Sequence, residues 1–120
     1  SDLIELSVKP HAVFSRKGEN LLLTIPVTFA EAALGADIKV PTLSGDDVTV
    51  RLAAGTPTGR VLRVKGRGVE SAKGHGDLLI TIDVQVPQRI EGAAKKALED
   101  FATATKEFNP RADLAQKAKA

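Results

Sequence analysis

The sequence predicts a mainly β domain that contains one short helix and is followed by an amphipathic helix at the C-terminal end. Two observations support this fold class. Apolar side chains recur at every second position in runs spread over residues 1–87, which is typical of half-buried strands. After Pro87 the apolar positions are separated by alternate steps of four and three residues, which is typical of a helix.

The first strands are expected at residues 3–8 and 21–29. Residues 3–8 alternate between apolar and polar side chains, and Pro10 ends the run. Residues 21–29 form an extended apolar run that follows a turn-like segment. Pro26 lies inside this run, and because proline has no N–H to donate, it indicates an edge position or a bulge.

A short helix is expected at residues 30–34, where Gly35 would end it. Residues 37–42 and 48–52 alternate on either side of a turn at residues 44–47, so they are expected to pair as a hairpin. The apolar residues of this hairpin either fill an ordinary core or lie on an exposed strand that accepts an extended peptide by strand addition. The residues concerned are Ile38, Val40, Val48 and Val50.

Two more strands are expected before Pro87. Residues 60–65 form a short strand, with Leu62 and Val64 predicted on its inner face. Residues 66–76 are rich in glycine and are expected to form a loop. Residues 77–87 have the clearest strand pattern in the chain. The side chains predicted to share one of its faces are those of Leu78, Ile80, Ile82, Val84 and Val86.

The stripe after Pro87 predicts a helix over residues 91–108, which Asn109 and Pro110 would end. Residues 111–120 would form a second, short helix with a basic end. The apolar stripe either covers the sheet of its own chain or meets a second copy in a symmetric dimer, and the spacing supports both interpretations. The residues proposed for the dimer contact are Ala94, Leu98, Phe101 and Phe108.

The composition excludes several kinds of chemistry in this chain of 120 residues and 12.6 kDa. Because there is no Cys, disulfides, thiolate nucleophiles, iron–sulfur clusters and Cys-based zinc sites cannot form. His11 and His75 have no suitably spaced third ligand, so we predict neither a metal site nor an enzyme. No apolar run reaches the roughly 20 residues that cross a bilayer. The chain does not begin with Met, so we expect it to be a piece of a longer protein.

One basic cluster lies between residues 60 and 73 and has two interpretations. The first is a small basic β-domain that binds nucleic acid through phosphate contacts. The second is that the charges protect an edge strand from aggregation. The scarcity of aromatic residues, which are limited to four Phe, disfavours a nucleic-acid surface built from stacked rings. The cluster consists of Arg60, Arg63, Lys65, Arg67 and Lys73.

Six motifs occur in the order that is found in one protein family. They read HxVFxRxGxNL at residues 11–21, VxFxEAALG at 27–35, VPTLxG at 40–45, GTxxG at 55–59, RVKGRGV at 63–69 and GDLL at 76–79. Together they resemble the second C-terminal domain of bacterial DnaJ-type J-domain co-chaperones. Two departures, Ala12 and Ala54, stand where that family often has proline, and they affect loop stiffness more than function.

This resemblance implies a two-sheet β-sandwich over residues 11–88 that binds unfolded or partly folded client polypeptides. Residues 1–10 then correspond to the closing strand of a preceding, similar domain. Residues 89–120 correspond to a dimerisation helix and a basic tail. Client binding is thereby assigned to Ile38, Val40, Val48 and Val50, and homodimerisation to Ala94, Leu98, Phe101 and Phe108.

Full-length members of the family are cytoplasmic co-chaperones that pass clients to an ATP-driven chaperone of the seventy-kilodalton heat-shock class. That step requires a J domain with a His-Pro-Asp tripeptide, which this sequence lacks. Zinc, where a family member has it, belongs to a Cys-rich module that this sequence also lacks, so we expect no cofactor here. The resemblance therefore implies a non-enzymatic module with no membrane partner, which binds clients and dimerises.

Overall fold

The computed structural model describes residues 13–119 and divides the chain into two compact units, Ser1–Val86 and Pro87–Ala120. Each unit is described by itself. The strand predicted at residues 3–8 lies outside the described residues, and so does His11.

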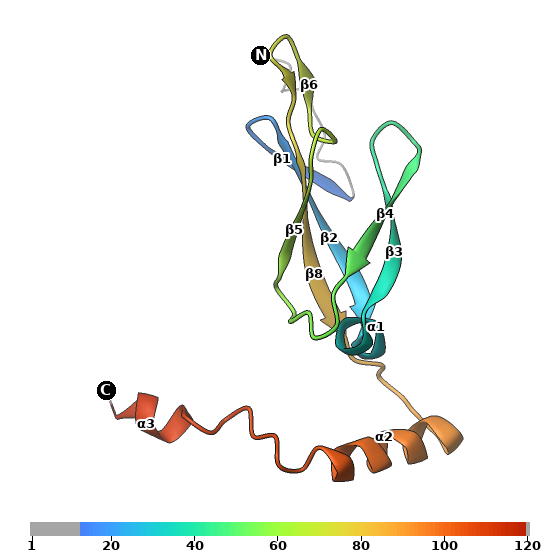
Figure 1. Cartoon of the computed structure of the whole chain (residues 1–120), viewed down its shortest axis with the longest axis vertical. Coiled ribbons are helices and arrows are strands. Elements are labelled where there is room, and N and C mark those ends of the chain that lie inside the picture. Colours follow the sequence, from blue (N-terminus) through green and yellow to red (C-terminus); the bar gives the residue numbers. More distant parts are fainter. Residues whose placement is uncertain (1–12, 120) are drawn as a thin grey trace. The chain divides into compact units, whose positions relative to one another are not determined.

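The first unit is built on a four-stranded sheet, which we call sheet A (Figure 1). Its order is β1 (Phe14–Lys17), β2 (Asn20–Thr28), β8 (Leu78–Gln85) and β5 (Val61–Val64). The two central strands, β2 and β8, are parallel and stay in register over the whole of β8. The outer strands β1 and β5 each run antiparallel to the strand that they border.

A hairpin of β3 (Ala36–Pro41) and β4 (Asp47–Leu52) forms a second sheet, as the alternation on either side of residues 44–47 predicts. Figure 1 shows this hairpin beside sheet A. A third, very short pair, β6 (Glu70–Ser71) and β7 (Gly74–His75), lies inside the glycine-rich segment that was expected to be only loop.

The short helix α1 (Phe29–Leu34) connects β2 to the hairpin, close to its predicted position. It begins with a capping box, in which Thr28 Oγ1 accepts the Glu31 N–H at 3.0 Å and Glu31 Oε1 accepts the Thr28 N–H at 2.9 Å. It ends at Gly35, whose φ of 86° suits glycine. A Cβ at Gly35 would also lie 3.0 Å from the Leu52 carbonyl oxygen. Both the backbone conformation and the limited space therefore favour glycine at this position.

The core lies between sheet A and the β3–β4 hairpin, which confirms the mainly β fold with two packed sheets. Alternate residues of β2 and β8 point inward, and Leu52 and Val40 approach them from the hairpin. Leu62 and Val64 of β5 pack against this core from their predicted inner face. The buried apolar residues are Phe14, Leu21, Leu23, Val27, Ala32, Val40, Leu52, Leu78, Ile80 and Ile82.

Pro26 occupies an edge-like position in β2, as predicted. Strand β1 pairs only with residues 20–23 of β2, so at Pro26 the described chain pairs with β2 only on the β8 side, opposite Asp83. A residue without an N–H is tolerated where no second ladder needs that donor.

The prediction that Val86 shares the buried face of the last strand is wrong. Strand β8 ends at Gln85, and Val86 is 82% exposed. The last register pair of β8 is Gln85 with Thr28, and Thr28 is already the N-cap of α1. Beyond that point β2 offers no partner, so the strand pattern continues in the sequence after the sheet has ended.

The second unit consists of α2 (Gly92–Ala104) and α3 (Leu114–Ala118). Helix α2 is shorter than the predicted 91–108, and Asn109 and Pro110 do not end it. The hydroxyls of Thr103 and Thr105 donate to the Glu99 and Phe101 carbonyls at 3.2 and 2.9 Å. Such bonds satisfy terminal carbonyls while competing with the helical ladder, and β-branched threonines favour helices weakly. The helix therefore ends at the threonines.

Candidate functional site

The four residues predicted to bind clients lie together on the inner face of the hairpin. Ile38 is opposite Val50 and Val40 is opposite Val48, and all four belong to the core or pack against it. Val40 is only 1% exposed. Of the two interpretations left open by the alternation, the structure favours the core: Val40 lies in it, and Ile38, Val48 and Val50 are half-buried against it. A role in client binding stays a prediction, and it would have to act through the hairpin's main chain or its half-buried rim.

Strand edges are the first feature that could receive an extended peptide. In the described part of the chain, β3 and β4 each have only one neighbouring strand, and β5 is an edge strand of sheet A. An edge strand presents a row of main-chain N–H and C=O groups on its open side, and these groups can pair with another polypeptide.

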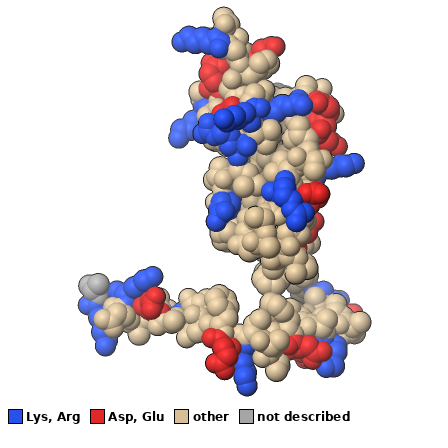
Figure 2. Space-filling view, viewed as in Figure 1, with Lys and Arg blue, Asp and Glu red and all other residues tan. Residues whose placement is uncertain are grey.

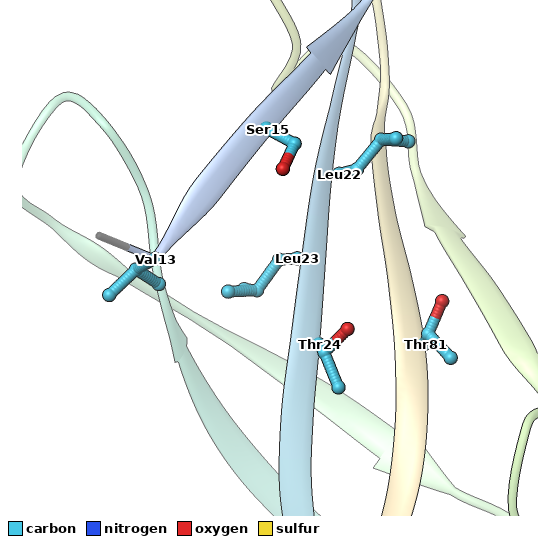
Figure 3. A pocket seen from close by; sticks show the side chains of 6 residues that line it. All are labelled: Val13, Ser15, Leu22, Leu23, Thr24 and Thr81. Carbon is cyan, nitrogen blue, oxygen red and sulfur yellow. The ribbon is translucent and has the colours of Figure 1, made fainter. Parts of the chain in front are cut away.

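The second feature is a hollow of about 460 Å³ on sheet A, which we call the outer-face hollow. Figure 3 shows its lining side chains coming from the segment that begins β1, from β2 and from β8. No charged side chain lines it, so it offers van der Waals contact and hydroxyl hydrogen bonds rather than ion pairs. The lining residues are Val13, Ser15, Leu22, Leu23, Thr24 and Thr81.

Sequence reasoning missed the outer-face hollow, although one signal pointed to it. In an alternating strand only every second residue faces the core, and Leu21 and Leu23 take those places in β2. Leu22 between them is therefore an apolar residue on the outer face, and it is only half-buried. An uninterrupted apolar run in a strand that is covered on one face marks a second apolar surface.

The dimer residues are only partly brought together. Ala94, Leu98 and Phe101 lie on one face of α2, and Leu98 and Phe101 are 47% and 44% exposed. No residue of α2 is buried. Phe108 lies beyond the end of the helix and does not continue the helical stripe, which corrects the predicted four-residue stripe. Dimerisation itself stays a prediction.

The Asp77 carboxylate, immediately before β8, accepts hydrogen bonds from β5 and from the segment that follows β5. Its Oδ2 accepts a hydrogen bond from Arg63 Nη1 of β5 at 2.7 Å, and its Oδ1 accepts the Gly66 N–H at 3.0 Å. The Gly66 hydrogen bond is the main cause that lowers the pKa of Asp77, and the charges of Arg63 and Lys65 act in the same direction. This arrangement connects the start of β8 to β5 and to the segment that follows β5.

A second carboxylate network lies at the tip of the β3–β4 hairpin. Hydrogen bonds from the Ser44 and Thr42 hydroxyls lower the pKa of Asp46 to about 2, and Arg67 lies 3.2 Å from its Oδ2. Arg67 belongs to the segment after β5, so this ion pair connects the hairpin tip to that segment. An open groove of about 580 Å³ lies beside this connection, with Leu43 and Val69 among its lining residues.

The residues of the basic cluster belong to different elements of the first unit. Arg60 and Lys65 flank β5 and Arg63 lies within it, whereas Arg67 is paired with Asp46 and Lys73 lies in the turn between β6 and β7. Figure 2 shows Lys and Arg side chains gathered on one face of the first unit. Three of the five cations therefore accompany a strand edge, which is the arrangement that edge protection predicts.

Within residues 13–119, no group of three or more His, Cys, Asp or Glu residues is placed to hold a metal ion. His75 lies 3.5 Å from a Glu70 carboxylate oxygen across the β6–β7 pair. No described helix is both long enough and apolar enough to cross a bilayer.

Comparisons with known proteins agree with the motif pattern. The family model for the DnaJ C terminal domain matches residues 2–87. Chaperone protein DnaJ 1 of Streptomyces coelicolor is 50% identical over 117 residues, which cover 97% of this chain and 29% of that protein. Chaperone protein DnaJ 1 of Mycobacterium leprae is 53% identical over 112 residues, which cover 91% of this chain and 29% of that protein. The chain thus spans less than a third of the length of these relatives.

Proposed function

Because the chain belongs to the DnaJ C-terminal domain family, we propose that it is a non-enzymatic co-chaperone module that binds unfolded polypeptide and dimerises. Family membership supports the co-chaperone role. The observation that carries client binding is the outer-face hollow, an uncharged surface on a sheet whose other face is already packed. It combines exposed Val13 and half-buried Leu22 with serine and threonine hydroxyls. Apolar contacts and main-chain hydrogen bonds can accommodate clients of many different sequences, because neither requires a particular side chain.

The hairpin is proposed to bind clients through its main chain and its half-buried rim rather than through its core side chains. An extended client would pair with the main chain at the open edge of the hairpin, while Val40 remains in the core. Half-buried Ile38, Val48 and Val50 would be reached only at the rim. Val48→Asp tests this rim: it should weaken client binding with the fold intact, and full activity of that variant would contradict the hairpin surface.

The outer-face hollow is tested by suppression of the aggregation of a chemically denatured protein, followed by light scattering. Leu22→Asp places a charge in the uncharged hollow and should reduce the suppression at least about fivefold. Thr49→Asp, on the exposed side of β4, adds the same charge elsewhere and should have no effect. Both variants must keep the wild-type circular dichroism spectrum. Equal suppression by Leu22→Asp and wild type would contradict the hollow, and a wild-type chain without suppression would contradict client binding.

Dimerisation is proposed through the exposed stripe of α2, formed by Ala94, Leu98 and Phe101. Apolar residues on one face of an isolated helix lose their contact with water when two such helices pair. The supporting observation is that this whole face is solvent-exposed in a single chain. Phe108 would contribute from beyond the helix.

Delivery of clients to a seventy-kilodalton heat-shock chaperone is proposed for the full-length protein, in the cytoplasm. This chain lacks the His-Pro-Asp tripeptide, so alone it should not stimulate ATP hydrolysis by that chaperone. An ATPase measurement with and without the chain tests this expectation, and stimulation would contradict it. No cofactor is required by the proposed activities.

A further inference from the structure

We infer that the open edge of β5 binds extended polypeptide segments that carry carboxylates. The inference rests on the proposed client binding and names one class of segment that the module would prefer. In the described chain β5 has β8 on one side and no strand on the other. Four observations, on the main chain, the charges, the apolar residues and the spacing, indicate an acidic occupant.

The register shows which main-chain groups face the open side. The Ile82 N–H donates to the Arg60 carbonyl at 2.8 Å, and Leu62 is opposite Ile80. In an antiparallel pair, residues with inward-bonding groups alternate with residues whose N–H and C=O point away. The groups of Val61 and Arg63 therefore point to the open edge, where an added strand would find them.

The charges along this edge have one sign. Residues 58–67 contain Arg60, Arg63, Lys65 and Arg67 and no acidic residue. Arg63 is paired with Asp77 at 2.7 Å, and Arg67 is paired with Asp46. Arg60 and Lys65 have no ion pair within residues 13–119, although the Lys65 charge contributes to the lowered pKa of Asp77. The two ends of β5 are thus positive and available.

Apart from Arg63, which is paired with Asp77, the strand between Arg60 and Lys65 is apolar. Val61 is exposed on the outer face, and Leu62 and Val64 are half-buried at the rim of the core. Four residues of strand lie between Arg60 and Lys65, so the two positions are five steps, or roughly 17 Å, apart at about 3.3 Å per residue. The matching occupant is an extended segment with aliphatic residues in its middle and a carboxylate toward each end. Opposite charges in cross-strand positions favour such pairing, and like charges oppose it.

Edge protection makes a different prediction from the same charges. If the cations only prevent edge-to-edge aggregation, no peptide adds to β5, whatever its charge. Nucleic acid makes a third prediction, because phosphates would bind the cations without using the main chain of β5. A proline at Val61 separates these cases. It removes an N–H that points to the open edge and leaves the β8 ladder donors in place.

The experiment measures fluorescence anisotropy of labelled eight-residue peptides with the 120-residue chain. The three peptides have the same aliphatic centre and carry Glu, Ser or Lys toward both ends. The Glu peptide should bind at least about tenfold more tightly than the Ser peptide, and the Lys peptide least. Val61→Pro should weaken binding of the Glu peptide at least about tenfold. Arg60→Glu with Lys65→Glu should remove the preference, whereas the matched control Lys39→Glu with Lys73→Glu should retain it.

Several outcomes would overturn the inference. Equal affinity for the three peptides would do so, and so would binding that is lost in the Arg60/Lys65 variant but unchanged in Val61→Pro. Tighter binding of a twelve-nucleotide single strand than of the Glu peptide, again unchanged by Val61→Pro, would assign the cations to nucleic acid. The aggregation assay is run on the same variants. If wild type suppresses aggregation but shows no peptide preference, the inference fails and client binding stands; if wild type does neither, the proposed function fails as well.

Discussion

The side-chain oxygen of Asn20 accepts the main-chain N–H of Asp77 at 2.9 Å, across 57 positions of sequence. Asn20 begins β2, and Asp77 immediately precedes β8. At the next residue of β2, the Leu21 N–H donates to the Asp77 carbonyl at 2.9 Å, and this hydrogen bond starts the parallel ladder between the two strands. The Asn20 side chain therefore aligns the two central strands of sheet A at the point where their pairing begins.

Removal of this acceptor should destabilise the first unit. Asn20→Ala leaves the partly buried Asp77 N–H without its partner, and the loss of such a partner costs about 1–3 kcal/mol. Urea unfolding followed by circular dichroism measures the loss. Asn109→Ala is the matched control, since Asn109 Oδ1 accepts the Arg111 N–H at 3.0 Å in an exposed position of the second unit. Equal, small effects of the two variants would contradict the aligning role of Asn20.

Gly76 should tolerate no side chain. A Cβ at this position would lie 1.8 Å from the Glu19 carbonyl oxygen, so the main chains would have to separate. That separation would disturb the Val69 N–H bond to the same oxygen, which is 2.8 Å long. Gly76→Ala should cost at least about 3 kcal/mol of unfolding free energy, in the upper part of the range for single substitutions.

Gly45→Ala provides the control for this prediction. Gly45 has a φ of 97°, and a Cβ there would have no neighbour within 4 Å. Only backbone strain is then added, which costs about 1 kcal/mol. A Gly76→Ala protein as stable as the Gly45→Ala protein would show that the close approach to Glu19 is not required.

Stability should fall in acid because of Asp46. Its pKa is about 2 in the folded chain, below the value of about 3.9 for an unfolded Asp. A carboxylate with a lowered folded pKa stabilises the fold above the unfolded value, and this stabilisation is lost as the pH falls toward the folded value. The stability difference between wild type and Asp46→Asn should therefore be constant near neutral pH and shrink from about pH 4 to pH 2. A difference that does not change over this interval would contradict the hydrogen bonds from Ser44 and Thr42 as its cause.

The second unit should set the oligomeric state. Leu98→Asp with Phe101→Asp places two charges on the exposed stripe of α2, and burial of those charges at a helix–helix contact is unfavourable. We expect wild type to be a dimer at micromolar concentration and the variant to be a monomer, by light scattering coupled to size-exclusion chromatography. Thr103→Asp adds a charge on the opposite face of α2, and this variant should remain dimeric. A monomeric wild type would contradict the proposal directly.

Much of the chain was predictable because its signals are local. The alternation in residues 37–52 predicted the β3–β4 hairpin, and Gly35 marked the end of α1. The ordered motifs identified the family, which the comparisons confirm. The helix after Pro87 was also correct in kind, but its end was not, because the backbone bonds of Thr103 and Thr105 outweighed a stripe that continued to Phe108.

The sequence by itself determined where the longer strands and the short helix lie and which of their residues share a face, but not β1 or the short β6–β7 pair. Only the tertiary structure decided that β2 and β8 pair in parallel, that Val40 points into the core and that Leu22 lies in a hollow. The physical reason is that a period of two residues defines two faces of a strand without specifying which one is covered. The covered face depends on neighbours that are distant in sequence, and contacts such as Asn20 with Asp77 bring those neighbours together.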